Sequence, residues 1–153
     1  MTNTIAVCVL IAFAVICIVI LAVNPYAIGD SNDFLRDFVN HEFLNILGVV
    51  VAITLASAAQ LHLALNGIEE RHKKKNQFVD TRQGIRTAAF ALIWLFGAAV
   101  LLVIVKPLLP NAEWISALMN GMAIFIVLWN VLVLVALTEA VFGIPSQVDD
   151  DPQ

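Results

Sequence analysis

A few polar side chains inside long apolar stretches are the residues of this 153-residue chain that could do chemistry. They are Ser57, Gln60, His62, Asn120, Asn130 and Glu139. Polar groups at membrane depth either line a path for an ion or substrate or bond one helix to another, and the sequence leaves both interpretations open. An amide without a partner in hydrocarbon costs several kcal/mol. Gln60 and Asn130 fall at similar depths, so we expect that they can hydrogen-bond to each other.

Motifs of enzymes and cofactor sites do not occur in the sequence: it has no His-Glu-x-x-His, no glycine-rich phosphate loop and no serine elbow. A bis-histidine haem site needs two histidines at one depth on facing helices. His41 and His62 fall at opposite ends of one predicted helix and His72 falls in a loop, so only a homodimer could pair two copies of His62. We interpret Asp37, His41 and Glu42 as a solvated face rather than a metal site. We therefore expect a protein that is not an enzyme and has no cofactor and no metal.

Small residues recur every four positions along the second apolar stretch. They are Gly48, Ala52, Ala56 and Ala64, and Gln60 completes the series. Four residues turn a helix by about 400°, so the series stays near one face. Small side chains let a second helix approach closely in lipid, where the hydrophobic effect gives helices no reason to associate. The series predicts a helix-packing seam, either within one bundle or between chains.

Basic residues are concentrated in one segment, because six of the eight lie between Arg71 and Arg86. The other two, Arg36 and Lys106, fall in the first and third loops. Basic residues of short loops stay on the cytoplasmic side, so the middle loop and, with four crossings, both termini are predicted to be cytoplasmic. Bases in this loop would contact anionic lipid headgroups or a partner protein, each contributing about 1 kcal/mol near such a surface. The residues predicted for that patch are Arg71, Lys73, Lys74 and Lys75.

Four apolar stretches must position all of these residues. The chain is 61% hydrophobic and only 13% charged, whereas soluble domains are about 25% charged. The stretches cover about 5–23, 44–68, 87–105 and 114–142, close to the ~20 residues that cross a bilayer. Because lipid offers no hydrogen-bond partners, each must be helical. We predict an all-α, four-helix integral protein of a cytoplasmic (inner or plasma) membrane, which does not bind nucleic acid.

The loops between these stretches carry some order of their own. Ser31 is a suitable N-cap for a short helix in the first outer loop. The apolar positions of this amphipathic helix are Phe34, Leu35, Phe38 and Val39, and we expect it to continue into Phe43. Pro110 makes the third loop a tight turn, so the last two long helices should form an antiparallel hairpin. Residues 1–145 are predicted to form a single domain, followed by an acidic cytoplasmic tail at 146–153.

The four stretches are not equivalent in composition. The first and third carry almost no polar residues and are expected to face lipid, whereas the second and fourth would hold any working interior. The main hypothesis is a non-enzymatic subunit of a homo- or hetero-oligomeric membrane complex, with its seam on the second helix. The first alternative is an oligomeric ion channel or membrane-depolarising pore lined by the second or fourth helix. The second alternative is a small carrier or cofactor-holding membrane subunit.

Overall fold

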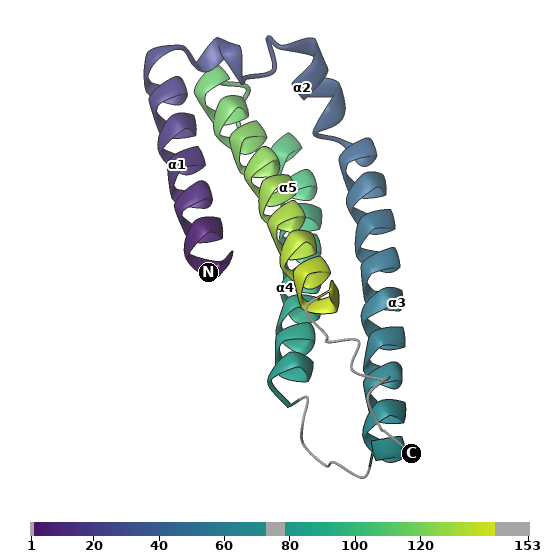
Figure 1. Cartoon of the computed structure of the whole chain (residues 1–153). Coiled ribbons are helices and arrows are strands. Elements are labelled where there is room, and N and C mark those ends of the chain that lie inside the picture. The colour runs from purple at the N-terminus through teal and green to yellow at the C-terminus, as the bar shows by residue number, and fades with distance from the viewer. Residues whose placement is uncertain (1, 73–78, 143–153) are drawn as a thin grey trace.

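Four long helices with short connections make up the fold. The structure is a computed structural model that describes residues 2–72 and 79–142. Its elements are α1 (Thr2–Val23), η1 (Pro25–Ala27), α2 (Asp33–Phe38), α3 (His41–His72), α4 (Val79–Val105), η2 (Lys106–Leu108) and α5 (Glu113–Phe142) (Figure 1). These described ranges contain no strand. Helices α1, α3, α4 and α5 are each long and apolar enough to cross a membrane, as predicted for a multi-pass membrane protein.

The long helices extend past the apolar stretches that predicted them. Helix α3 has 32 residues, which span about 48 Å and exceed the ~30 Å of bilayer hydrocarbon. Helix α4 begins at Val79, eight positions before the predicted start at 87. Hydropathy marks only the part of a helix that lies in hydrocarbon, whereas polar residues with good helix propensity continue the same hydrogen-bond ladder into the interface.

Helix α4 lies in the middle of the arrangement together with α5. It packs against α5 on one side and α3 on the other, and α1 packs against α5, so the spatial order is α1, α5, α4, α3 (Figure 1). Leu92 and Ala99 of α4 are completely buried. Other residues of α4, including Ile93, Trp94 and Leu101, are exposed, so the expectation that the third helix faces lipid can apply to only part of its surface. Hydropathy cannot separate the two parts, because lipid tails are as apolar as a helix interface. Helix α1 does match the expectation, since no residue of its candidate span is buried.

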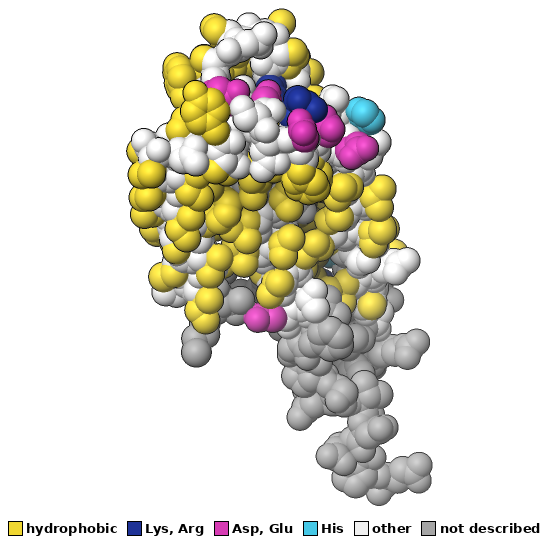
Figure 2. Space-filling view, turned by 90° about the horizontal axis from the view of Figure 1, so that it is seen from above, with side chains coloured by type: hydrophobic (Ala, Val, Ile, Leu, Met, Phe, Trp, Pro, Cys, Tyr) yellow, Lys and Arg dark blue, Asp and Glu magenta, His cyan; other side chains and the backbone are white. Residues whose placement is uncertain are grey.

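The two ends of the molecule differ in what they carry. One end, called the α2 end, holds η1, α2 and η2, and α4 and α5 form the predicted antiparallel hairpin there (Figure 1). The opposite end, called the loop end, is where α3 passes into α4, and α1 begins and α5 ends on that side. Acidic and basic side chains gather in one group at the α2 end, and hydrophobic side chains cover much of the surface beside it (Figure 2).

The packed core contains two clusters of buried residues along α4. The cluster nearer the α2 end consists of Val39, Phe43, Leu47, Leu95, Ala99, Leu102, Ala123 and Ile126. The cluster nearer the loop end consists of Val51, Ala58, Leu65, Ile85, Leu92 and Leu137. The members from α3 follow one another at helical spacing, so α3 gives a single face to the core. Its opposite face is left without a neighbour among the described helices.

The N-terminus of α2 differs from the prediction in one residue. Asn32, and not Ser31, is the N-cap, and its side-chain oxygen accepts the Leu35 backbone N–H at 3.4 Å. Both residue types suit this position. Ser31 is unavailable because its hydroxyl bonds to Glu113 at the start of α5, a contact that no local pattern reveals.

A turn at Val39 separates α2 from α3, so the expectation of one continuous helix through Phe43 is wrong. Val39 has φ −81° and ψ 62°, and the Asn40 N–H donates to the Phe38 carbonyl at 2.8 Å. These are the features of an inverse γ-turn. The turn places Val39 in the core, where it is 3% exposed, and α3 begins anew at His41.

Candidate functional site

A buried polar cluster at the α2 end is the most elaborate group of interactions that the structure describes. It consists of Asp30, Lys106 and Asn120 and is called the Lys106 cluster. The Lys106 ammonium donates to Asp30 Oδ1 at 2.8 Å and to Asn120 Oδ1 at 2.8 Å. The Asn120 amide in turn donates to Asp30 Oδ1 at 3.1 Å and to the Ile28 carbonyl at 3.0 Å. The cluster therefore joins the connection after α1 to the end of α4 and to α5.

Local chain geometry places each member of the Lys106 cluster. Helix α4 stops at Val105, because Pro107 has no N–H to continue the ladder, and the chain turns into η2. Lys106 is the first residue of that turn. Asp30 follows the η1 turn, which is closed by the Gly29 N–H donating to the Pro25 carbonyl at 2.8 Å. Asn120 lies on the completely buried face of α5.

Burial and charge act against each other at Asp30. The side chains of Lys106 and Asp30 are 14% and 33% exposed, and Asn120 is fully buried. Burial alone raises the pKa of Asp30, but the hydrogen bonds from Lys106 and Asn120 and the charge of Lys106 outweigh it and hold the pKa below its usual range. Asp30 is therefore a weak base whose carboxylate stays ionised and paired.

Glu113 adds a second contact between the first connection and α5. Its Oε1 accepts the Ser31 hydroxyl at 2.7 Å, and its buried Oε2 has no hydrogen-bond partner among the described residues. Gly29 lies so close that a Cβ there would stand 2.5 Å from Oε2 and 3.0 Å from the Pro25 carbonyl oxygen. A side chain at position 29 would therefore displace the Glu113 carboxylate from its present place. The position of Glu113 in the first turn of α5 also places its negative charge at the positive end of the helix dipole.

A pocket of about 260 Å³ lies beside the Lys106 cluster. Its polar lining comes from Asp30, Arg36, Asn40, Lys106, Asn111 and Ser116. Arg36 is paired with Asp33 at 2.9 Å and with Asp37 at 3.3 Å, so its charge is compensated within α2. The charges around this pocket hold one another in place, and the arrangement serves best to fix the connections over the helix ends.

Gln60 and Asn130, expected to bond across the bundle, do not do so in the described structure. Asn130 is 2% exposed, and neither atom of its amide has a hydrogen-bond partner among the described residues. Gln60 is exposed. It comes two positions after Ala58, which faces the core, and two residues turn a helix by about 200°. Equal depth therefore did not bring the two amides together, because Gln60 points away from the core and Asn130 is buried.

The small-residue series on α3 divides into two parts. Gly48 faces α4, where a Cβ on it would lie 3.6 Å from the Phe96 ring. The other members are exposed in the described chain: Ala52, Ala56, Gln60 and Ala64. Ser57 is exposed beside them and donates to the Ile53 carbonyl at 3.0 Å. Most of the predicted seam is thus not covered by the described helices of this chain.

The remaining predicted residues lie toward the loop end. His62 and Glu139 are both exposed, on α3 and α5 respectively. Arg71 belongs to the last turn of α3, and Lys73, Lys74 and Lys75 lie outside the described residues. Among the described residues, no three His, Cys, Asp or Glu side chains form a group that could hold a metal ion.

The pairing of Lys106 with Asp30 and Asn120 was missed in the sequence. A usable signal was present, since Lys106 is the single charge that directly follows the third apolar stretch. A lysine at the edge of hydrocarbon either extends to water or finds a carboxylate. Asp30 is 76 positions away in the sequence, so only the packing of the helices selects it from among the acids at that end.

Replacing Lys106 by methionine tests the Lys106 cluster. We expect Lys106→Met to lower the free energy of unfolding by about 1–3 kcal/mol, since the Asp30 carboxylate loses its charged partner. Because the pKa of Asp30 is lowered in the folded state, its contribution is present above its ordinary value of about 4 and is lost as pH falls through the folded pKa. Thermal unfolding of the purified protein in detergent, measured against pH, should show a smaller acid dependence for the variant.

The double variant Asp30→Asn/Lys106→Met is the matched control. It removes both charges, so no unpaired charge remains and it should be more stable than Lys106→Met alone. Equal unfolding temperatures for the wild type and both variants would show that the ion pair does not stabilise the fold.

Comparison with protein-family models, with curated proteins and with solved structures finds no significant match to this chain. The function is therefore argued from the geometry of the chain. That geometry comprises a polar cluster tying the α2 end, an uncovered face on α3 and a basic loop end.

Proposed function

We propose that this chain is a non-enzymatic helical subunit of a larger membrane complex and that the exposed face of α3 contacts the next subunit. The Gln60 amide carries the proposal, because it is exposed within a helix suited to span the membrane. Gln60 lies seven residues from the end of that candidate span at Gly67, or about 10 Å along the helix. An amide at that depth costs several kcal/mol unless another polar group bonds to it.

The neighbours of Gln60 suit a close approach by another helix. Ala52, Ala56 and Ala64 surround the amide with small exposed side chains on the same face. In lipid, helices associate through close packing and interhelical hydrogen bonds, which this combination supplies. The partner is a second copy of the chain or another membrane subunit.

Enlarging Ala56 tests the proposed seam. Ala56→Leu should separate the helices and weaken association by about 1–3 kcal/mol, or roughly fivefold to 150-fold. Chemical cross-linking in the source membrane, followed by mass measurement in mild detergent, reports the change. Ala12→Leu is the matched control, because Ala12 is an exposed alanine on the lipid-facing helix α1. If the protein is monomeric both in the membrane and in detergent, with and without Ala56→Leu, the proposed seam does not exist.

An oligomeric pore is the second candidate, favoured by the exposed Ser57 hydroxyl beside Gln60. Several copies of α3 could line a polar path with these two side chains. Asn120 and Asn130 are buried within the chain, so they do not belong to a pore between copies. Planar-bilayer recording of the reconstituted protein should then show a conductance that Gln60→Leu reduces at least severalfold. If no conductance is recorded across a range of voltages and salt concentrations, the protein does not form a pore.

The orientation in the membrane follows from the basic residues. We propose that the protein lies in an inner or plasma membrane. Its loop end, which carries Arg82 and Arg86, then faces the cytoplasm. This orientation is tested by introducing one cysteine at a time, at an exposed position, into the Cys8→Ser/Cys17→Ser variant. Asn111→Cys at the α2 end should react with an impermeant thiol reagent in intact cells, and Val79→Cys only after permeabilisation. The reverse pattern would invert the topology.

A further inference from the structure

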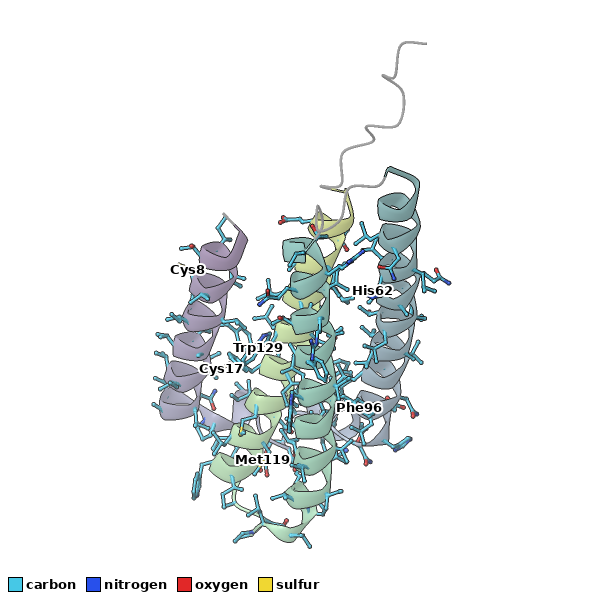
Figure 3. All side chains as sticks on the ribbon, turned by 90° about the horizontal axis from the view of Figure 1, so that it is seen from below. Cys8, Cys17, His62, Phe96, Met119 and Trp129 are labelled. Atoms are coloured by element: carbon cyan, nitrogen blue, oxygen red, sulfur yellow. The ribbon has the colours of Figure 1, made fainter. Side chains whose placement is uncertain are left out.

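A groove of about 410 Å³ lies between α1, α4 and α5, on the side of the molecule away from α3. Figure 3 labels Cys17 on its α1 wall and Trp129 on its α5 wall, and α4 contributes Leu95 and Ala98. The lining residues on these three helices all belong to the candidate membrane spans. The groove therefore lies at the depth of lipid hydrocarbon.

The lining of the groove is apolar. Among the described residues, no charged, amide or hydroxyl side chain lines it. Ala14, Ala98, Ala117 and Gly121 make it hollow, because their small side chains leave space between larger neighbours. Apolar cavities stay dry, since water finds no hydrogen-bond partners in them, and an empty groove deprives its lining atoms of van der Waals contacts. The space is therefore suited to an apolar occupant.

The width of the groove separates one apolar occupant from another. Along α5 the groove extends from Ala117 to Trp129, which is about 18 Å at the rise of a helix. Spread over that length, a volume of 410 Å³ gives a mean cross-section of about 23 Å². An α-helix with its side chains covers roughly 80 Å², whereas an extended hydrocarbon chain covers roughly 20 Å², because nonbonded carbons approach to about 4 Å. The groove is thus one chain wide and too narrow for a helix of a second copy.

The position of the groove along the helices selects one leaflet. Ile28, in the connection after α1, lines it at the α2 end, and a Cβ on Gly121 would lie 3.9 Å from that side chain. Trp129 lines it at the other end, about 15 Å along α5 from the end of the candidate span at Glu139. One leaflet contributes about 15 Å of hydrocarbon, half of the bilayer core. The groove therefore reaches from the interface at the α2 end to the region of the bilayer centre.

We propose that this groove binds one acyl chain of a phospholipid from the leaflet at the α2 end. The end of the chain lies near Trp129, and the headgroup lies at the membrane surface beyond Ile28. The site goes beyond the proposed seam, because it lies on the α1 side of the molecule and uses no residue of α3.

The bound chain completes the attachment of α1 to the bundle. Helix α1 packs mainly against α5 and η1, and no residue of its candidate span is buried. Ala14 on α1 and Ala98 on α4 face the groove from two sides, so the chain fills the space between these helices. Without the chain, α1 loses contacts that no other described element supplies.

Native mass spectrometry of the full chain tests the proposal by counting the phospholipids that stay bound after extraction from the membrane. A steroid-based detergent is used, because its ring system is wider than one hydrocarbon chain and does not replace the lipid. We expect one phospholipid to stay bound.

Adding defined lipids to the delipidated protein separates the chain from the headgroup. Dimyristoyl phosphatidylcholine and dimyristoyl phosphatidylglycerol should bind equally and raise the unfolding temperature by similar amounts, because the groove contacts the chain alone. Dihexanoyl phosphatidylcholine should do neither, since its chains end well before Trp129.

Two variants fill the groove from different walls. Ala98→Leu on α4 and Ala14→Leu on α1 should each weaken phospholipid retention about tenfold, because the added carbons take the place of the chain. Ala12→Leu is the matched control, since Ala12 is an exposed alanine of α1 that does not line the groove. It should retain the phospholipid as the wild type does.

Three results would overturn the proposal. The first is a folded wild-type protein that retains no phospholipid. The second is binding that follows the charge of the headgroup or is equally strong for the dihexanoyl lipid, which would place the lipid elsewhere on the surface. The third is retention by Ala98→Leu and Ala14→Leu that equals that of Ala12→Leu. If either groove variant does not fold, the other variant and the chain-length comparison decide, and a monomer that retains the lipid supports the groove even where the α3 seam is absent.

Discussion

The ion pair between Lys106 and Asp30, completed by the Asn120 amide, is the interaction on which the arrangement at the α2 end depends. In a bilayer, apolar packing discriminates poorly between one helix and another, since lipid offers the same contacts. A lysine at the edge of hydrocarbon is different, because it requires a particular partner in a particular place. The pairing therefore selects one arrangement of the connection after α1, the end of α4 and the start of α5. The hydrogen bond from the Ser31 hydroxyl to Glu113 joins the same segments.

The two ends of the protein place their basic residues in different surroundings. At the α2 end, Arg36 and Lys106 have carboxylate partners within the chain, so these groups are already neutralised. At the loop end, Arg82 and Arg86 line an open groove together with apolar side chains. The pairs at the α2 end therefore stabilise the protein itself. The uncovered amide at Gln60 lies between these ends and faces away from α4.

Hydropathy predicted the four long helices because their length and composition are set by the thickness of the bilayer. It could not predict that α4 packs between α5 and α3, since Leu92 meets apolar atoms equally in lipid or in the core. Depth counting likewise paired Gln60 with Asn130, although the rotation of a helix, and not depth alone, decides which side chains meet. At α2, Ser31 and Asn32 are both good caps, and a contact with Glu113 decides between them. Contacts between residues far apart in the chain thus decide the helix packing and the N-cap, which local patterns leave open.

The spatial order of the helices differs from their order in the chain. Helices α1 and α3 lie at opposite edges, so residues 24–40 form a strap that passes over the end of the α4–α5 hairpin (Figure 1). In the chain, α1, the strap and α3 all precede the hairpin. Asp30 therefore finds its partners, Lys106 and Asn120, in segments that are synthesised after α3. The length of this strap must therefore match the combined width of α4 and α5, which lie between α1 and α3.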